Sequence, residues 1–162
     1  MQSNPYGADL EDRDALQALS ETPQQIEALV KDWSDDMFER SYAPGKWSAR
    51  KLLAHLAQTE LALTTRARFA ITTPGYRAQS FDQDVWMPLD EQLDARTALA
   101  AYTTLRRMNL AMWRGLTPEQ RQRSFFHPDF GDLDVMWIAA QMAGHDIHHL
   151  KHFQQIGASA RA

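Results

Sequence analysis

The most informative absence in this chain of 162 residues is cysteine, which does not occur at all. Without cysteine the protein has no disulfide bonds, no cysteine nucleophile and no thiolate ligands of its own for a metal ion. If thiol chemistry takes place here, the thiol has to come from a small molecule.

Long apolar runs and an excess of positive charge are also missing. No run approaches the roughly 20 apolar residues that a membrane-spanning helix needs, and residues 1–9 lack the basic and apolar regions of a secretory signal. The net charge is −4, and residues 1–40 hold ten acidic and three basic side chains. Such a chain is a poor ligand for nucleic acid. We therefore expect a cytoplasmic protein that binds neither membranes nor nucleic acids.

The sequence does contain enough apolar residues for one hydrophobic core. Hydrophobic residues make up 44% of the chain and charged residues 23%, as in ordinary globular proteins. A length of 162 residues is typical of a single domain. We predict one domain over residues 1–162, in which residues 1–13 form a loose N-terminal arm.

Four segments have the apolar periodicity of amphipathic helices. They cover residues 22–33, 48–71, 94–114 and 134–156. Thr22 followed by Pro23 is a typical helix start, and Ser48 is another. No segment shows the alternation of a β-strand, and residues 76–92 and 125–131 are irregular. The pattern predicts an all-α four-helix bundle with long second and fourth helices.

Histidine is concentrated in the last of these helices. Four of the six histidines lie within eight residues, at positions 145, 148, 149 and 152. The core-facing stripe of this helix passes through Ile138, Met142, His145, His149, Phe153 and Ile156. His145 and His149 thus stand where a helix usually buries Leu or Ile, whereas His148 and His152 lie at the edge of the stripe. Buried ring nitrogens need partners, which either ordinary hydrogen bonds or a shared metal ion would provide.

A third histidine favours the metal ion. His55 and Leu63 lie on the inner face of the helix predicted over residues 48–71. Cofactor sites in bundles form between facing helices. His55 can therefore approach His145 and His149 across the core.

Four pieces of sequence, in this order, carry a resemblance to a known family. They are Pro44-Gly45-Lys-Trp47-Ser48 followed by His55-Leu56, the acidic and aromatic loop Ser80 to Trp86, His127-Pro128 with Gly131, and His145-x-x-His148-His149-x-x-His152. Over residues 22–156 the chain resembles the DinB/YfiT-like superfamily of metal-binding four-helix bundles, and in particular the YfiT branch, which is similar to bacillithiol S-transferases. The match departs at Asp146, where a small residue is usual and the rim of the pocket would change, and at Phe153, which replaces an aliphatic residue.

The resemblance implies that His55, His145 and His149 hold a divalent metal ion. A three-histidine site suits zinc, nickel, copper or iron, and we expect zinc in the cell and nickel as an alternative in a purified sample. Three imidazoles leave a coordination position open. The ion would either lower the pKa of a bound water for hydrolysis or hold a small-molecule thiol as its thiolate. Since relatives use bacillithiol or mycothiol, the resemblance implies a thiol S-transferase that acts on small electrophiles. The alternatives are a metal-dependent hydrolase and a non-catalytic stress protein that binds a metal or a small ligand.

Other residues are candidates for supporting roles. His127, His148 and His152 either assist at the site or are ordinary turn and surface residues. A ligand histidine usually donates its second N–H to a carboxylate or carbonyl, and the candidate partners are Gln141, Thr59 and Glu60. Arg66 lies three turns beyond His55 on nearly the same face. It would meet either an anionic substrate group or an acid at the end of the bundle.

The association state is a further expectation. A homodimer is the default for a small bundle of the family that the chain resembles. Apolar residues on the back of the last helix suit either a dimer seam or packing on the first helix; they are Met136, Ala140 and Ile147.

Overall fold

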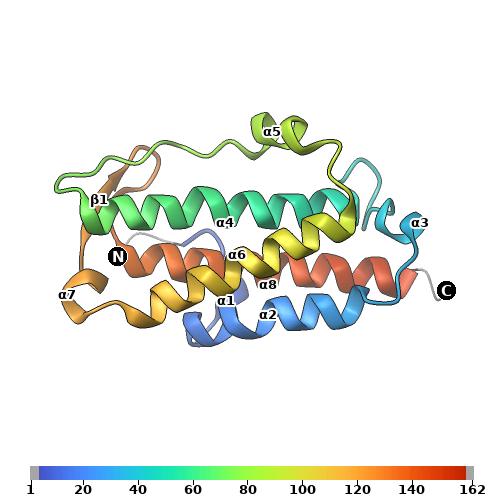
Figure 1. The fold of residues 1–162 in the computed structure, drawn as a ribbon, viewed down its shortest axis with the longest axis horizontal. Helices are drawn as coiled ribbons and strands as arrows, with labels where there is room; N and C mark the ends of the chain where they lie inside the picture. Colours follow the sequence, from blue (N-terminus) through green and yellow to red (C-terminus); the bar gives the residue numbers. More distant parts are fainter. Residues whose placement is uncertain (1–3, 160–162) are drawn as a thin grey trace.

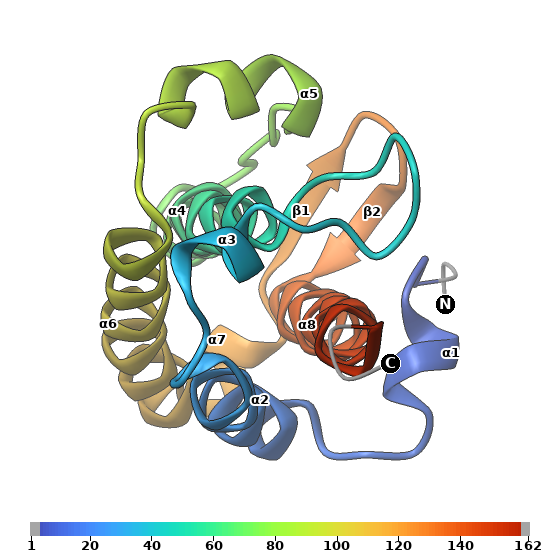
Figure 2. The same ribbon diagram turned by 90° about the vertical axis from the view of Figure 1, so that its right-hand side faces the viewer.

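The structure is a computed structural model that describes residues 4–159. Four long helices run side by side (Figure 1): α2 (Ala15–Val30), α4 (Ala49–Thr72), α6 (Ala95–Gly115) and α8 (Val135–Ser159). Seen end-on, α6 and α8 each contact both α2 and α4, so α2 and α4 lie diagonally opposite each other (Figure 2). The predicted four-helix bundle is confirmed, and α4 and α8 are neighbours within it.

The helix starts follow local capping chemistry. Asp14, Ser48 and Asp94 precede α2, α4 and α6, and each side chain accepts a hydrogen bond from a backbone N–H of the first turn. Thr117 and Gln120 form a capping box at the short helix α7 (Pro118–Arg121). The starts of α4 and α6 therefore agree with the predicted boundaries.

The first long helix starts about two turns earlier than predicted, with Asp14 as its N-cap instead of Thr22. Pro23 lies inside α2, where it has no N–H to donate to the carbonyl group four residues before it. The Leu19 carbonyl oxygen instead accepts a hydrogen bond from Nη1 of Arg106 at 2.9 Å. A side chain from α6 thus compensates for the proline and allows the helix to continue through it.

The segment predicted to be irregular over residues 125–131 lies within a small hairpin. Strand β1 (Ser124–His127) pairs antiparallel with β2 (Gly131–Asp134). The prediction without strands was wrong here, because strands of four residues are too short to show a clear alternation. The other connections contain three short helical elements: α3 (Asp35–Phe38), α5 (Gln83–Trp86) and the 3-10 helix η1 (Met87–Asp90).

The N-terminal segment packs against α8. Its helix α1 (Gly7–Leu10) ends on a buried leucine, Leu10. The Asp9 carboxylate accepts a hydrogen bond from Nζ of Lys151 at 2.6 Å and lies 3.2 Å from Nδ1 of His148. The prediction of a loose arm was therefore wrong for residues 4–13. Residues 1–3 lie outside the described residues.

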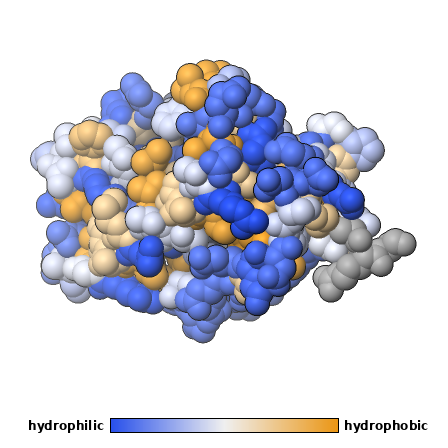
Figure 3. Space-filling view, turned by 45° about the vertical axis from the view of Figure 1, so that its right-hand side comes forward, coloured by the Kyte–Doolittle hydropathy of each residue, from blue (hydrophilic) through white to orange (hydrophobic). Residues whose placement is uncertain are grey.

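The back of α8 is used for packing within the chain. Ile147 is buried, and Met136 and Ala140 pack partly buried against the same hydrophobic cluster as Leu19 of α2. On the outer face shown in Figure 3, hydrophobic and hydrophilic residues are interspersed. Among the described helices, none is both long enough and apolar enough to cross a membrane.

Candidate metal centre

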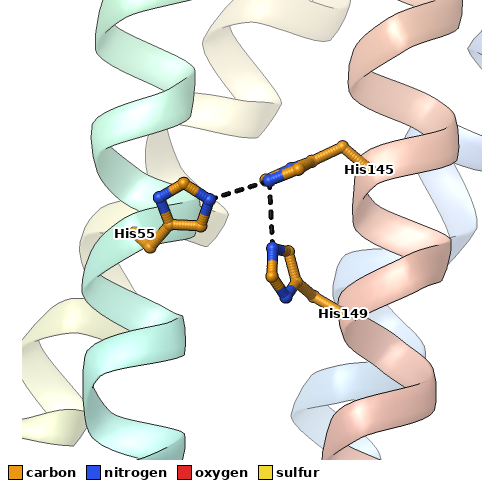
Figure 4. Close-up of side chains that lie close together, drawn as sticks. All are labelled: His55, His145 and His149. Carbon is orange, nitrogen blue, oxygen red and sulfur yellow. Dashed lines mark hydrogen bonds between the residues drawn. The ribbon is translucent and has the colours of Figure 1, made fainter. Parts of the chain in front are cut away.

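Three histidines meet between α4 and α8 (Figure 4). Nε2 of His55 lies 2.8 Å and Nε2 of His149 lies 3.0 Å from Nε2 of His145. Each residue offers a ligand atom within 4.8 Å of the other two. All three rings are buried. The structure thus brings together the three residues that the resemblance implies as ligands; that they bind a metal ion stays a prediction.

The geometry and charge of these rings fit a divalent ion. A tetrahedral ion with nitrogen ligands at about 2.0–2.1 Å would hold those nitrogens about 3.3 Å apart, close to the two observed separations. A neutral imidazole carries a single N–H. Burial, and then the neighbouring His145, holds the pKa values of His55 and His149 well below 6.5. Both rings are therefore neutral at pH 7, which is the form that binds a metal ion.

The second ring nitrogens have different surroundings. Nδ1 of His149 lies 3.3 Å from Nδ1 of His152. The Nδ1 atoms of His55 and His145 are buried and have no hydrogen-bond partner within residues 4–159. A carboxylate oxygen of Asp146 lies 3.9 Å from Nδ1 of His145. This distance allows electrostatic attraction but is too long for a hydrogen bond.

Glu60 and Asp146 belong to a buried network around Arg106. The guanidinium donates to Glu60 through Nε at 2.8 Å, and its Nη1 lies 2.7 Å from Asp146. Asn109 donates to Glu60 at 2.7 Å, and the Tyr102 hydroxyl donates to Asp146 at 2.9 Å. Glu60 is therefore not the partner of a ligand histidine, and Asp146 does not form the rim of the pocket. Both expectations were wrong, because a buried cation needs these carboxylates as partners.

His55 and His145 line a cavity of about 290 Å³. Its apolar wall includes Leu63, Phe81 and Phe130, and its polar groups include Thr59, Gln141, Arg66 and His127. The Thr59 hydroxyl and the Gln141 carbonyl oxygen are buried and have no hydrogen-bond partner within the described residues. These polar groups are thus free to hold a bound molecule next to the histidines.

Tyr6 stands between this cavity and a second one. The second cavity, of about 320 Å³, is lined by His148, His149 and His152, and Tyr6 lines both. The Tyr6 ring meets the His145 ring edge-on, with centroids 5.0 Å apart. Sequence reasoning missed Tyr6, because its position depends on contacts with α8, which is distant along the chain.

The three candidate helper histidines occupy different places. His127, at the end of β1, lines the same cavity as His55 and is 3% exposed. His148 contacts Asp9, as described above. His152 stacks on Tyr42 with ring centroids 3.8 Å apart, and burial followed by the nearby His148 lowers the pKa of His152 to about 4. The structure thus brings Nδ1 of His152 to 3.3 Å from Nδ1 of the predicted ligand His149.

Comparison with known proteins gives consistent matches along most of the chain. It is 26% identical over 140 residues to a protein of Oceanobacillus iheyensis (86% of this chain, 81% of the relative). It is also 26% identical over 144 residues to YfiT of Bacillus subtilis (87% and 81%). Both relatives are provisionally named metal-dependent hydrolases.

Solved structures of similar proteins also match this chain along most of its length. The structure of YfiT from Bacillus subtilis, described as having an unusual four-helix bundle topology, matches with a TM-score of 0.82 and 25% identity over 90% of this chain and 85% of YfiT. A mycothiol-dependent maleylpyruvate isomerase matches with a TM-score of 0.70 and 13% identity, over 86% of this chain and 59% of the isomerase. At this low identity the second match shows a common fold.

The family match includes the candidate site. A model of the DinB superfamily matches residues 18–153, a range that contains His55, His145 and His149. The buried three-histidine cluster and the names of the relatives agree on a metal-dependent protein. The chain belongs to the DinB superfamily.

Proposed function

We propose that the protein is a divalent-metal-dependent transferase that joins a low-molecular-weight thiol to a small electrophile. The observation that carries the proposal is a cluster of three buried histidines beside a cavity with a single carboxylate, Asp129, among its described lining residues. Asp129 lies in the turn of the hairpin, and its carboxylate accepts a hydrogen bond from the Ser80 hydroxyl at 2.9 Å. Apart from Asp129, only Tyr6 and His127 among the described lining residues could move protons, so the cavity offers few candidates for the general acid that hydrolysis usually needs at the leaving group.

Substitution by a thiolate requires fewer proton transfers from the protein than hydrolysis does. A divalent ion held by His55, His145 and His149 would supply an open coordination position and keep a thiol in its thiolate form near neutral pH. The sulfur forms a bond to the electrophilic carbon, the bond from carbon to the leaving group breaks, and the leaving group departs as an anion. No proton has to be delivered when that group is a halide.

The residues of the chain would bind and orient the reactants. Leu63, Phe81 and Phe130 offer apolar contact to the electrophile, while the unpaired polar atoms of Thr59 and Gln141 orient its polar groups. The absence of cysteine removes competing protein thiols. The likeness to a mycothiol-dependent isomerase also supports thiol chemistry.

Two other functions remain as alternatives. The names of the sequence relatives favour a metal-dependent hydrolase. A non-catalytic bundle that binds a metal ion or a small ligand is the third. A requirement for added thiol separates the transferase from the hydrolase. Turnover of a substrate separates both enzymes from the non-catalytic bundle.

The test uses protein loaded with zinc or nickel and the electrophile 1-chloro-2,4-dinitrobenzene. Thioether formation is followed with cysteine, coenzyme A, bacillithiol and mycothiol, and 4-nitrophenyl acetate without thiol reports hydrolysis. We expect metal-dependent thioether formation with at least one thiol, which is lost in His55→Ala and kept in Arg68→Gln. Ester hydrolysis without thiol, in the absence of any thiol transfer, would contradict the proposal and favour the hydrolase.

A further inference from the structure

Two of the arginines that the structure describes are buried, and they differ in their partners. Arg106 is 2% exposed and forms ion pairs with Glu60 and Asp146. Arg66 is 6% exposed and has no carboxylate within ion-pair distance among residues 4–159. Buried charges in proteins are normally paired. Asp129 acts on Arg66 only from beyond ion-pair distance, so a close anionic partner for Arg66 would have to come from outside the described residues.

Most N–H groups of the Arg66 guanidinium have no hydrogen-bond acceptor within the described residues. Its Nη2 donates to the Gln79 carbonyl oxygen at 2.7 Å, the one hydrogen bond that this side chain makes within the described residues. A guanidinium has five N–H groups and stays charged at neutral pH, although burial lowers the pKa of Arg66. Arg66 lines the cavity that also contains His55 and His145. Its unused N–H groups can thus meet a molecule bound there.

His127 supplies a neutral donor beside this charge. Its Nδ1 accepts a hydrogen bond from the backbone N–H of Asp129 at 3.1 Å, which places the ring proton on Nε2. Burial, followed by the charge of Arg66, lowers the pKa of His127. The ring is therefore neutral at pH 7. Its Nε2–H has no protein partner in the described part of the chain.

We propose that Arg66 and His127 form a subsite for a carboxylate, so that a substrate of this cavity is a small carboxylic acid whose reactive end faces the three histidines. The role of this subsite in the reaction rests on the proposed function, whereas the binding of a carboxylate there does not. His55 and Arg66 lie eleven residues apart on α4, so their Cα atoms are about 16 Å apart along the helix axis. The long arginine side chain makes the distance between its guanidinium and the histidine ring shorter than this. The subsite thus selects acids with a short chain between their two ends.

The charge of the subsite favours a carboxylate over a phosphate. Arg66 contributes a single positive charge and His127 none, while the Asp129 carboxylate lies 3.7 Å from Nδ1 of His127. With Asp129 counted, a bound carboxylate leaves one net negative charge and a dianionic phosphate leaves two, so Asp129 repels the phosphate more strongly. A carboxylate can accept two parallel N–H bonds from a guanidinium.

The test is isothermal titration of the metal-free protein with three probes of similar chain: hexanoate, hexanamide and hexyl phosphate. We expect hexanoate to bind the wild type at least about tenfold more tightly than hexanamide, since a charge-assisted hydrogen bond is worth about a factor of ten or more. Hexyl phosphate should bind more weakly than hexanoate. Equal affinity for hexanoate and hexanamide, no measurable hexanoate binding, or tightest binding of the phosphate would each overturn the proposal. This comparison needs no variant.

A matched pair of variants locates the site. Arg66→Gln removes the proposed contact, and Arg68→Gln makes the same change two residues along α4, at a side chain that donates to Thr64 and does not line the cavity. We expect the first variant to lose about tenfold or more in hexanoate affinity and the second to match the wild type. Equal behaviour of the two variants would refute the assignment. Metal uptake is measured separately, so that a failure of the subsite can be told from a failure of the proposed function. Hexanoate binding without metal uptake would contradict the proposed function and leave the subsite intact.

Discussion

The backbone of Tyr6 lies directly against Gly144, in the turn of α8 that leads into His145, and leaves no room for a Cβ atom at position 144. Only glycine permits this approach without a shift of the backbone. The contact seats the N-terminal segment so that the Tyr6 ring meets the His145 ring and forms a wall of both cavities. A small residue in α8 thus makes the N-terminal segment part of the candidate site.

Gly144→Ala should therefore dislodge the N-terminal segment. We expect a loss of about 1–3 kcal/mol in the free energy of unfolding, as for other overpacked positions, together with faster proteolytic cleavage near residues 4–13. Urea unfolding and limited proteolysis measure the two effects. Gly115→Ala is the control, because a Cβ atom there meets open space, and the added side chain should be neutral or stabilising by up to about 1 kcal/mol. A Gly144→Ala variant with unchanged stability and a protected N-terminus would show that the segment does not need this contact.

The buried network around Arg106 should dominate the stability of the core. Glu60→Gln weakens the pairing of a fully buried cation, and we expect a loss of about 3–5 kcal/mol in urea unfolding. Glu39→Gln is a matched change at the surface, where the carboxylate lies 2.7 Å from Nε of Arg50 and is 56% exposed. That pair should contribute at most about 1 kcal/mol. Similar losses in the two variants would mean that burial does not set the strength of these ion pairs.

The metal-free protein should become less stable in mild acid. Burial, and then the neighbouring His145, keeps the pKa values of His55 and His149 well below 6.5 in the folded state. In the unfolded chain these rings titrate near 6.5, so below that pH the unfolded state binds protons that the folded state does not. The melting temperature should therefore fall as the pH is lowered from about 7.5 to about 5.5 and recover on reversal. Thermal unfolding of the wild type and of His55→Gln checks this; a slope in the variant as steep as in the wild type would contradict it.

The parts of the fold that local sequence determines were predicted well. Ser48 and Asp94 are side-chain caps, and the inward stripe of α8 follows directly from a period of 3.6 residues, so the starts of α4 and α6 and the meeting of His145 with His149 could be predicted. Their approach to His55 required only that the two helices be neighbours in the bundle.

Apart from the short hairpin, the main errors involve contacts between residues far apart in the chain. Pro23 marks a helix start on local grounds, and only the hydrogen bond from Arg106 to the Leu19 carbonyl explains how α2 continues through it. Asp146 was expected at the rim of the pocket, whereas its ion pair with Arg106 of α6 holds it in the core. No local pattern reveals either partner.

Metal content tests most directly whether His55, His145 and His149 hold a divalent ion. Equilibrium dialysis against zinc and against nickel, followed by elemental analysis, would compare the wild type with the double variant His55→Ala, His145→Ala. His127→Ala is the control, since it removes a histidine from the same cavity but leaves the cluster intact. We expect about one equivalent of metal in the wild type and in the control, and little in the double variant. A wild type that takes up no metal, or a double variant that takes up as much as the wild type, would contradict the account.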